Sequence, residues 1–140
     1  MLDTIRTAQY FKVQVSNKPG EAARFLGALE AAHLNLLAFL AFPRNRRWQM
    51  DFVPDDPSAF KATVTRARFN GWKIQGPKTC FLVEGEDRVG AMAVCAHRLT
   101  IVKVNIHAVA SVVGGAGRYG VILWVKPKDV RRAAKALGIL

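Results

Sequence analysis

The sequence predicts an α+β protein made of two tandem βαββαβ units, the second of which lacks its last strand. A strand-like run joined by a glycine turn to a helical run occurs twice, and the two glycines, Gly20 and Gly90, are 70 residues apart. That offset is half of the 140-residue chain, and further residues of like type keep it. They are Phe11 with Phe81, Val13 with Val83, Leu29 with Leu99, Asn35 with Asn105, and Pro57 with Pro127. Self-similarity of this kind indicates a duplicated supersecondary unit, and we place the units at residues 1–76 and 77–140.

The first unit begins with alternating polar and apolar residues, which is the pattern of a strand with one buried face. After Gly20, apolar residues recur at three- and four-residue spacing as far as Ala32, which predicts an amphipathic helix. A basic turn, Pro43 to Arg46, separates two apolar runs and predicts a hairpin. The predicted elements are a strand at 10–15, a helix at 21–33, strands at 36–42 and 48–52, a helix from Pro57 stopped by Asn70-Gly71, and a strand at 72–75.

The second unit repeats this order, with elements predicted at 80–84, 91–99, 104–113, 119–125 and 127–137. It has no counterpart of the last strand, so one sheet edge would keep unpaired backbone groups, which folded proteins normally cover. We expect a homodimer to cover this edge and an apolar face carrying Leu82, Val121, Leu123 and Val125. Alternatively, the N-terminal arm supplies the strand, because Leu2 and Ile5 precede the first strand by a suitable distance.

Composition places the chain among folded globular proteins, with 51% hydrophobic residues and a mean hydropathy of +0.10. The N-terminus has no basic-then-apolar signal sequence, and no apolar run reaches the roughly 18 residues that span a bilayer, so we expect a cytoplasmic protein without membrane contact. Cys80 and Cys95 form no Cys-x-x-Cys pair and are expected to be buried free thiols. The net charge of +11 keeps an anionic partner, including nucleic acid, under consideration.

The turn Asn17-Lys18-Pro19-Gly20, followed after a helix by Asn35, resembles the motif of the ACT domain, a small ligand-sensing module. The motif returns as Asp87-Arg88-Val89-Gly90 with Asn105, so the resemblance covers nearly the whole chain in two ferredoxin-like copies. The tandem arrangement is similar to stand-alone ACT proteins and, less closely, to regulatory subunits of acetohydroxyacid synthase. The resemblance implies a non-enzymatic regulatory sensor that binds a small effector, most simply an amino acid, and that acts on itself or on a regulated enzyme.

In the ACT family the effector binds where the first turn of one module meets a neighbouring module. Open backbone N–H groups at a helix N-terminus receive a carboxylate, and a glycine leaves them accessible. The resemblance therefore implies a site built from six residues: Asn17, Gly20, Asn35, Asp87, Gly90 and Asn105. The two turns differ by a charge and by a proline, and the same residue types also serve as plain turn formers. A unit that only mediates oligomerisation is thus a further interpretation.

The sequence carries no pattern for catalysis, for a metal or for a cofactor. Its three histidines have no partner at metal or triad spacing, and the glycine-rich run Gly114 to Gly117 joins two strands without the features of a phosphate loop. The rival class is an RNA-binding module with the same βαββαβ order, which would use basic residues on the hairpin and on two helices. That class reads bases with sheet aromatics in a motif that is missing here, so nucleic acid is not the favoured partner.

Overall fold

The computed structural model describes residues 3–67 and 72–139 and divides the chain into two compact units. The first unit comprises residues 9–78, and the second unit comprises residues 1–8 together with 79–140. Each has the α+β architecture of a ferredoxin-like βαββαβ unit, which confirms the predicted fold class. The chain passes from the first unit to the second between residues 78 and 79, and the first eight residues group with the second unit.

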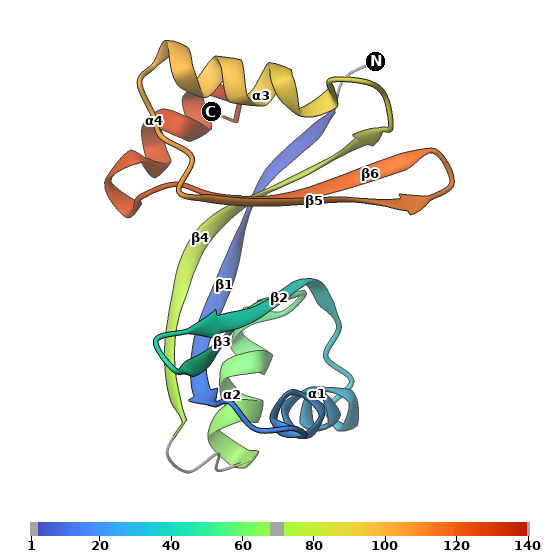
Figure 1. Cartoon of the computed structure of the whole chain (residues 1–140), viewed down its shortest axis with the longest axis vertical. Coiled ribbons are helices and arrows are strands. Elements are labelled where there is room, and N and C mark those ends of the chain that lie inside the picture. The colour runs from blue at the N-terminus through green and yellow to red at the C-terminus, as the bar shows by residue number, and fades with distance from the viewer. Residues whose placement is uncertain (1–2, 68–71, 140) are drawn as a thin grey trace. The chain divides into compact units, whose positions relative to one another are not determined.

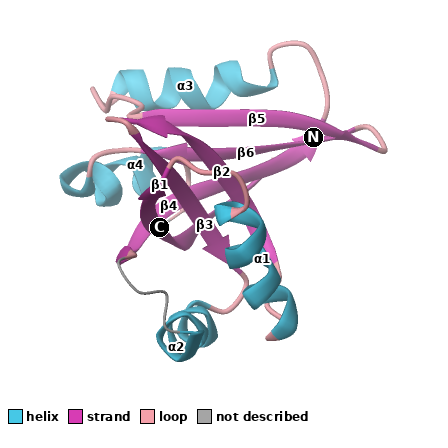
Figure 2. Ribbon diagram, turned by 60° about the horizontal axis from the view of Figure 1, so that its bottom comes forward, coloured by secondary structure: helices cyan, strands magenta, loops and turns pink. Residues whose placement is uncertain are grey.

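The elements alternate along the chain in nearly the predicted order (Figure 2). They are β1 (Thr4–Ser16), α1 (Glu21–Ala31), β2 (Leu36–Arg44), β3 (Arg47–Pro54), α2 (Pro57–Ala67), β4 (Lys73–Glu86), α3 (Ala91–Ile101), β5 (Ala108–Gly115), β6 (Arg118–Trp124), the 3-10 turn η1 (Pro127–Asp129) and α4 (Val130–Ala136). The predicted stop at Asn70-Gly71 lies outside the described residues.

Two strands serve both units (Figure 1). In the first unit the strand order is β2-β3-β1-β4, and in the second it is β1-β4-β6-β5. The predicted strands at 72–75 and 80–84 are parts of one strand, β4, which continues through Gly76-Pro77. Likewise β1 starts at Thr4, well before the predicted start at Tyr10.

The early start of β1 settles which segment supplies the missing strand. The N-terminal arm, which we define as residues 3–8, lies along the β4 edge of the second unit. Arg6 Nη2 is 3.9 Å from Glu84 Oε1, and Ile5 packs against the core of the second unit. The arm therefore occupies the edge left open by the absence of a fourth strand in the second repeat, while Leu2 lies outside the described residues.

Each unit has its own core between the strands and its two helices, and the predicted equivalent residues fill equivalent places. Phe11, Val13 and Leu29 are buried in the first unit, and their partners at the 70-residue offset are buried in the second. The helices α1 and α3 also end alike, because His33 and Lys103 both adopt a left-handed conformation, with φ of 57° and 58°. In the second unit this helix end ties the Val104 N–H to Leu99 O at 2.9 Å, so Val104 belongs to the helix end and not to the predicted strand, which begins at Ala108.

The structure corrects the predicted open face of the second unit. Val121, Leu123 and Val125 are members of the buried core on the helix side, because β6 pairs Leu123 with the core residue Phe81. The alternate residues of β6, Ile122 among them, have the opposite orientation, and Ile122 is paired with Leu82. The expected set therefore mixed residues from the two faces of the sheet. The cause is that β6 aligns with β3 at an offset of 71 residues, whereas the helices align at 70. The extra residue enters at the register shift in β5 between Val113 and Gly115.

Candidate functional site

Both predicted turns place an uncapped helix N-terminus at the surface. Gly20 precedes α1 with φ 92°, and Gly90 precedes α3 with φ 75°, which are left-handed conformations that favour glycine. Neither helix start receives a side-chain hydrogen bond, and a Cβ built on either glycine would meet nothing within 4 Å. Asn17 and Asp87 are exposed on these turns. The start of α1 is therefore accessible to an anion, whereas at the start of α3 the Ala91 and Ala93 N–H groups already donate to Arg88 O and Gly90 O, at 3.2 and 2.9 Å.

The two asparagines do not join these turns within a unit. Asn35 follows the C-terminal end of α1, whereas Gly20 precedes its N-terminal end, and 11 helical residues, about 16 Å, separate them. Asn105 has the same position relative to α3 and Gly90. Both asparagines are exposed, and Asn35 O accepts a hydrogen bond of 2.9 Å from Asp55 N. In each unit the glycine therefore lies on the same turn as Asn17 or Asp87, whereas Asn35 or Asn105 lies a helix length away.

The second turn opens onto a surface hollow of about 320 Å³, which we call the turn hollow. It lies between the start of α3 and the β5–β6 hairpin, and its wall includes Asp87, Arg88, Gly90, Ser111, Val112 and Tyr119. The turn is held to the hairpin by a 2.8 Å hydrogen bond from Asp87 N to Gly117 O. A helix N-terminus, a carboxylate and an apolar wall are therefore brought together within one unit.

Tyr119 is the unusual member of this wall. Tyr119 is only 6% exposed, its Oη is buried, and the Asp3 carboxylate is the polar group close to that hydroxyl. Burial and that carboxylate raise the pKa of Tyr119 to about 12, so the phenol is protonated at neutral pH. The hydroxyl therefore interacts with the N-terminal arm, and the rest of the side chain contributes to the wall of the turn hollow.

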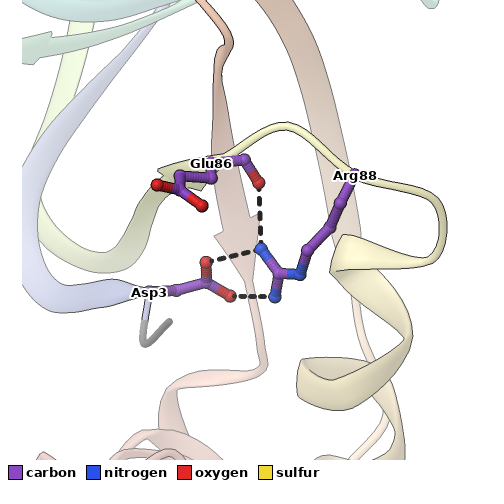
Figure 3. A network of polar contacts seen from close by, with 3 residues as sticks. All are labelled: Asp3, Glu86 and Arg88. Carbon is purple, nitrogen blue, oxygen red and sulfur yellow. Dashed lines mark hydrogen bonds and ion pairs between the residues drawn. The ribbon is translucent and has the colours of Figure 1, made fainter.

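Arg88 is fixed by the N-terminal arm (Figure 3). Its Nη1 and Nη2 each donate to one carboxylate oxygen of Asp3 at 3.0 Å, and Nη1 also donates to Glu86 O at 2.9 Å. This two-pronged pair lowers the pKa of Asp3, against the opposing effect of burial. The guanidinium also lies 5.9 Å from the ring centroid of Tyr119. The arm therefore sets the position of the second turn as well as closing the sheet edge.

Sequence reasoning missed Asp3, Gly85 and Tyr119 and gave no role to Arg88. A Cβ on Gly85 would contact the Asp3 carboxylate and lie 3.0 Å from the Tyr119 ring, so glycine is needed for this close approach. One signal was available, because Gly85 aligns with the buried Val15 at the 70-residue offset. A glycine at a core position indicates that another group fills the space.

No group of three or more histidine, cysteine or carboxylate residues within 3–67 and 72–139 could hold a metal ion. Cys80 and Cys95 are buried and unpaired, and burial raises the pKa of the Cys95 thiol. No helix in the described part of the chain is both long and apolar enough to cross a membrane.

No family model matches the sequence, and no curated protein is detectably similar to it. Solved structures share its architecture. Protein BT0572 from Bacteroides thetaiotaomicron superposes with a TM-score of 0.78 at 16% identity, covering 95% of this chain and 88% of that one. The ligand-free regulatory subunit of aspartate kinase from Thermus thermophilus gives a TM-score of 0.65 at 16% identity, covering 96% and 93%. This chain has the fold of that regulatory subunit.

The same regulatory-subunit fold recurs in a structure of aspartokinase alpha and beta subunits, with a TM-score of 0.61 at 20% identity, covering 95% of this chain and 93% of that chain. The likeness extends over nearly the full length of each chain, so it includes both βαββαβ units. At such low identity it is a likeness of fold.

Proposed function

We propose that the protein is a non-enzymatic regulatory module that binds a free amino acid at its second turn. The observation that carries the proposal is the turn hollow, where the start of α3, which has no side-chain cap, meets the exposed Asp87 carboxylate and an apolar wall. An α-carboxylate would accept from the Met92 N–H at the start of α3, and the α-ammonium would pair with Asp87. The fold shared with regulatory subunits of aspartate kinase supports a regulatory role.

The first turn is proposed as a weaker or different site. It offers the same open glycine, but Asn17 replaces the carboxylate that would pair with an ammonium. Asn35 and Asn105 each lie a helix length from the turn of their own unit, so neither would contact a ligand bound at that turn. Each remains a candidate for contact with a ligand that is held by the turn of a different module.

The test is a thermal-shift screen of the twenty amino acids, with short RNA included because of the +11 charge. A ligand at about 100 times its dissociation constant adds about 2.7 kcal/mol to the free energy of unfolding. The decisive variant is Asp87→Asn, which gives the second turn the uncharged side chain that Asn17 supplies in the first turn and should leave the stability of the free protein unchanged, because residue 87 is exposed. We expect the amino-acid shift to fall by the equivalent of about tenfold in affinity.

Asp55→Asn is the matched control, since it removes one exposed carboxylate from the first unit. An amino-acid response that is equal in wild type and Asp87→Asn would contradict the proposed site. A response to RNA and to no amino acid would favour the basic-surface alternative, in which exposed cations such as Lys61 and Arg66 on α2 contact phosphates.

We also propose that the protein is a homodimer and that it acts on an enzyme. The support for self-association is β5, an edge strand whose Val109, Val112 and Val113 are 49%, 67% and 55% exposed. Val112→Asp should convert a dimer to a monomer in sedimentation velocity while leaving the core intact. A wild-type chain that sediments as a monomer at every concentration would exclude the dimer.

A further inference from the structure

The two units differ at the helix that follows their turn. In the first unit Trp72 stacks on Phe25 of α1, with ring centroids 5.0 Å apart and planes 3° from parallel. The guanidinium carbon of Arg24 lies 5.4 Å from the Trp72 ring centroid on top of this stack. The first unit therefore closes the space between α1 and its edge strand with two aromatic rings.

The second unit has neither ring. Cys95 aligns with Phe25 at the 70-residue offset, and both are buried. Ile5 and Ile74 pack in the cores of their respective units, so the residues two places earlier on the same faces, Asp3 and Trp72, are equivalent. A thiol and a carboxylate thus stand where the first unit has a phenyl ring and an indole.

The exchange leaves a space, which we call the arm hollow. It has a volume of about 480 Å³ and is lined by the residues that replace the stack together with side chains from α3 and the end of α4. The lining residues are Asp3, Ile5, Arg88, Val94, Cys95, Arg98, Leu137 and Gly138. All of them belong to the second unit.

The arm hollow carries an uncompensated positive charge. Arg88 is neutralised by its two-pronged pair with Asp3, whereas Arg98, on the last turn of α3, forms no ion pair within the described residues. The charge of Arg98 lies close enough to the Cys95 thiol to act on it electrostatically. The equivalent residue in the first unit is Ala28, so the charge is particular to the second unit.

We propose that the arm hollow binds a small aromatic monocarboxylate. Its ring occupies the space that the Phe25–Trp72 stack fills in the first unit, against Ile5, Val94 and Leu137, and its carboxylate pairs with Arg98. A ligand with one negative charge matches the single unpaired guanidinium. This site is separate from the amino-acid site proposed at the second turn and does not depend on it, although Arg88 borders both hollows.

The test uses phenylacetate as the probe and 2-phenylethanol as its uncharged analogue, with binding followed by the backbone amide resonances of the whole chain. We expect phenylacetate to cause saturable shifts at Val94, Cys95, Arg98 and Gly138, and 2-phenylethanol to bind about tenfold more weakly. Cys95→Phe should fill the hollow with the ring that the first unit has and abolish these shifts, whereas the space-preserving control Cys95→Ser should retain them.

Arg98→Glu is a second test variant, which decides the question even if Cys95→Phe proves unstable. Arg98 is exposed, so its replacement should not affect folding. It should weaken phenylacetate binding at least tenfold and leave 2-phenylethanol binding unchanged. The proposal is overturned if phenylacetate causes no saturable shift at the arm hollow up to its solubility limit. It is equally overturned if the shifts persist in Arg98→Glu or in a folded Cys95→Phe variant.

Discussion

Gly85 offers the sharpest test of how the N-terminal arm is built into the second unit. The aligned residue of the first unit is the buried Val15, so the repeat alone suggests that a larger side chain at position 85 would be accepted. The structure predicts the opposite. A Cβ at Gly85 would contact the Asp3 carboxylate, lying 2.9 Å from its Cγ, and would be 3.0 Å from Tyr119 Cε1.

Gly85→Ala should therefore lower the free energy of unfolding by about 1–3 kcal/mol, the usual cost of adding a methyl group to a filled core. Gly120→Ala is the matched control, because Gly120 lies on the adjacent strand β6 and its Cβ would meet nothing within 4 Å. Neither glycine has a left-handed φ. The control should be neutral or should stabilise by about 0.4–1 kcal/mol, since alanine reduces the freedom of the unfolded chain.

Urea denaturation followed by circular dichroism measures both variants, and the midpoint at constant slope gives the change in stability. A double-mutant cycle with Asp3→Ala assigns the cause, because removing the carboxylate should relieve most of the cost of the added methyl group. If Gly85→Ala is as stable as Gly120→Ala, or if Asp3→Ala leaves the cost unchanged, the arm does not pack over Gly85 as described.

Two carboxylates should give acid titrations of opposite sign. The pKa of Asp3 is lowered from its ordinary 3.8 by the guanidinium of Arg88, which pairs with it. The ionised carboxylate therefore stabilises the folded protein fully above about pH 4, and this contribution is lost as the pH falls through the folded-state pKa. The difference in the free energy of unfolding between wild type and Asp3→Asn should shrink over the same range of acid pH. The pKa of Asp51 is raised from 3.8, chiefly by burial, so its charge costs stability as the pH rises above about 4. Asp51→Asn should therefore raise the urea midpoint at pH 7. The new amide would also donate to the buried Gln49 Oε1, which has no partner among the described residues. An unchanged or lower midpoint would contradict this account.

The sequence by itself determined the duplicated architecture, because both units have the same local sequence patterns. Alternating residues such as Phe11 and Val13 specify strands, and Gly20 and Gly90 are required by left-handed backbone at the two helix starts. These are short-range preferences, so the 70-residue offset was enough to find them twice. The helix starts of the candidate site were predictable for the same reason.

The tertiary structure alone decided how the second unit is completed and which residues surround its turn. The pairing of the N-terminal arm with β4 brings Asp3 to Arg88 across 85 positions of the chain, and no local pattern specifies such a pairing. The face occupied by Val121 and Leu123 depended likewise on a one-residue register shift in the preceding hairpin, and a shift of one residue reverses every side chain of a strand. Long-range register is set by the packing of the whole unit, and for this reason the arm, the role of Gly85 and the interaction of Tyr119 with Asp3 became visible only in the folded chain.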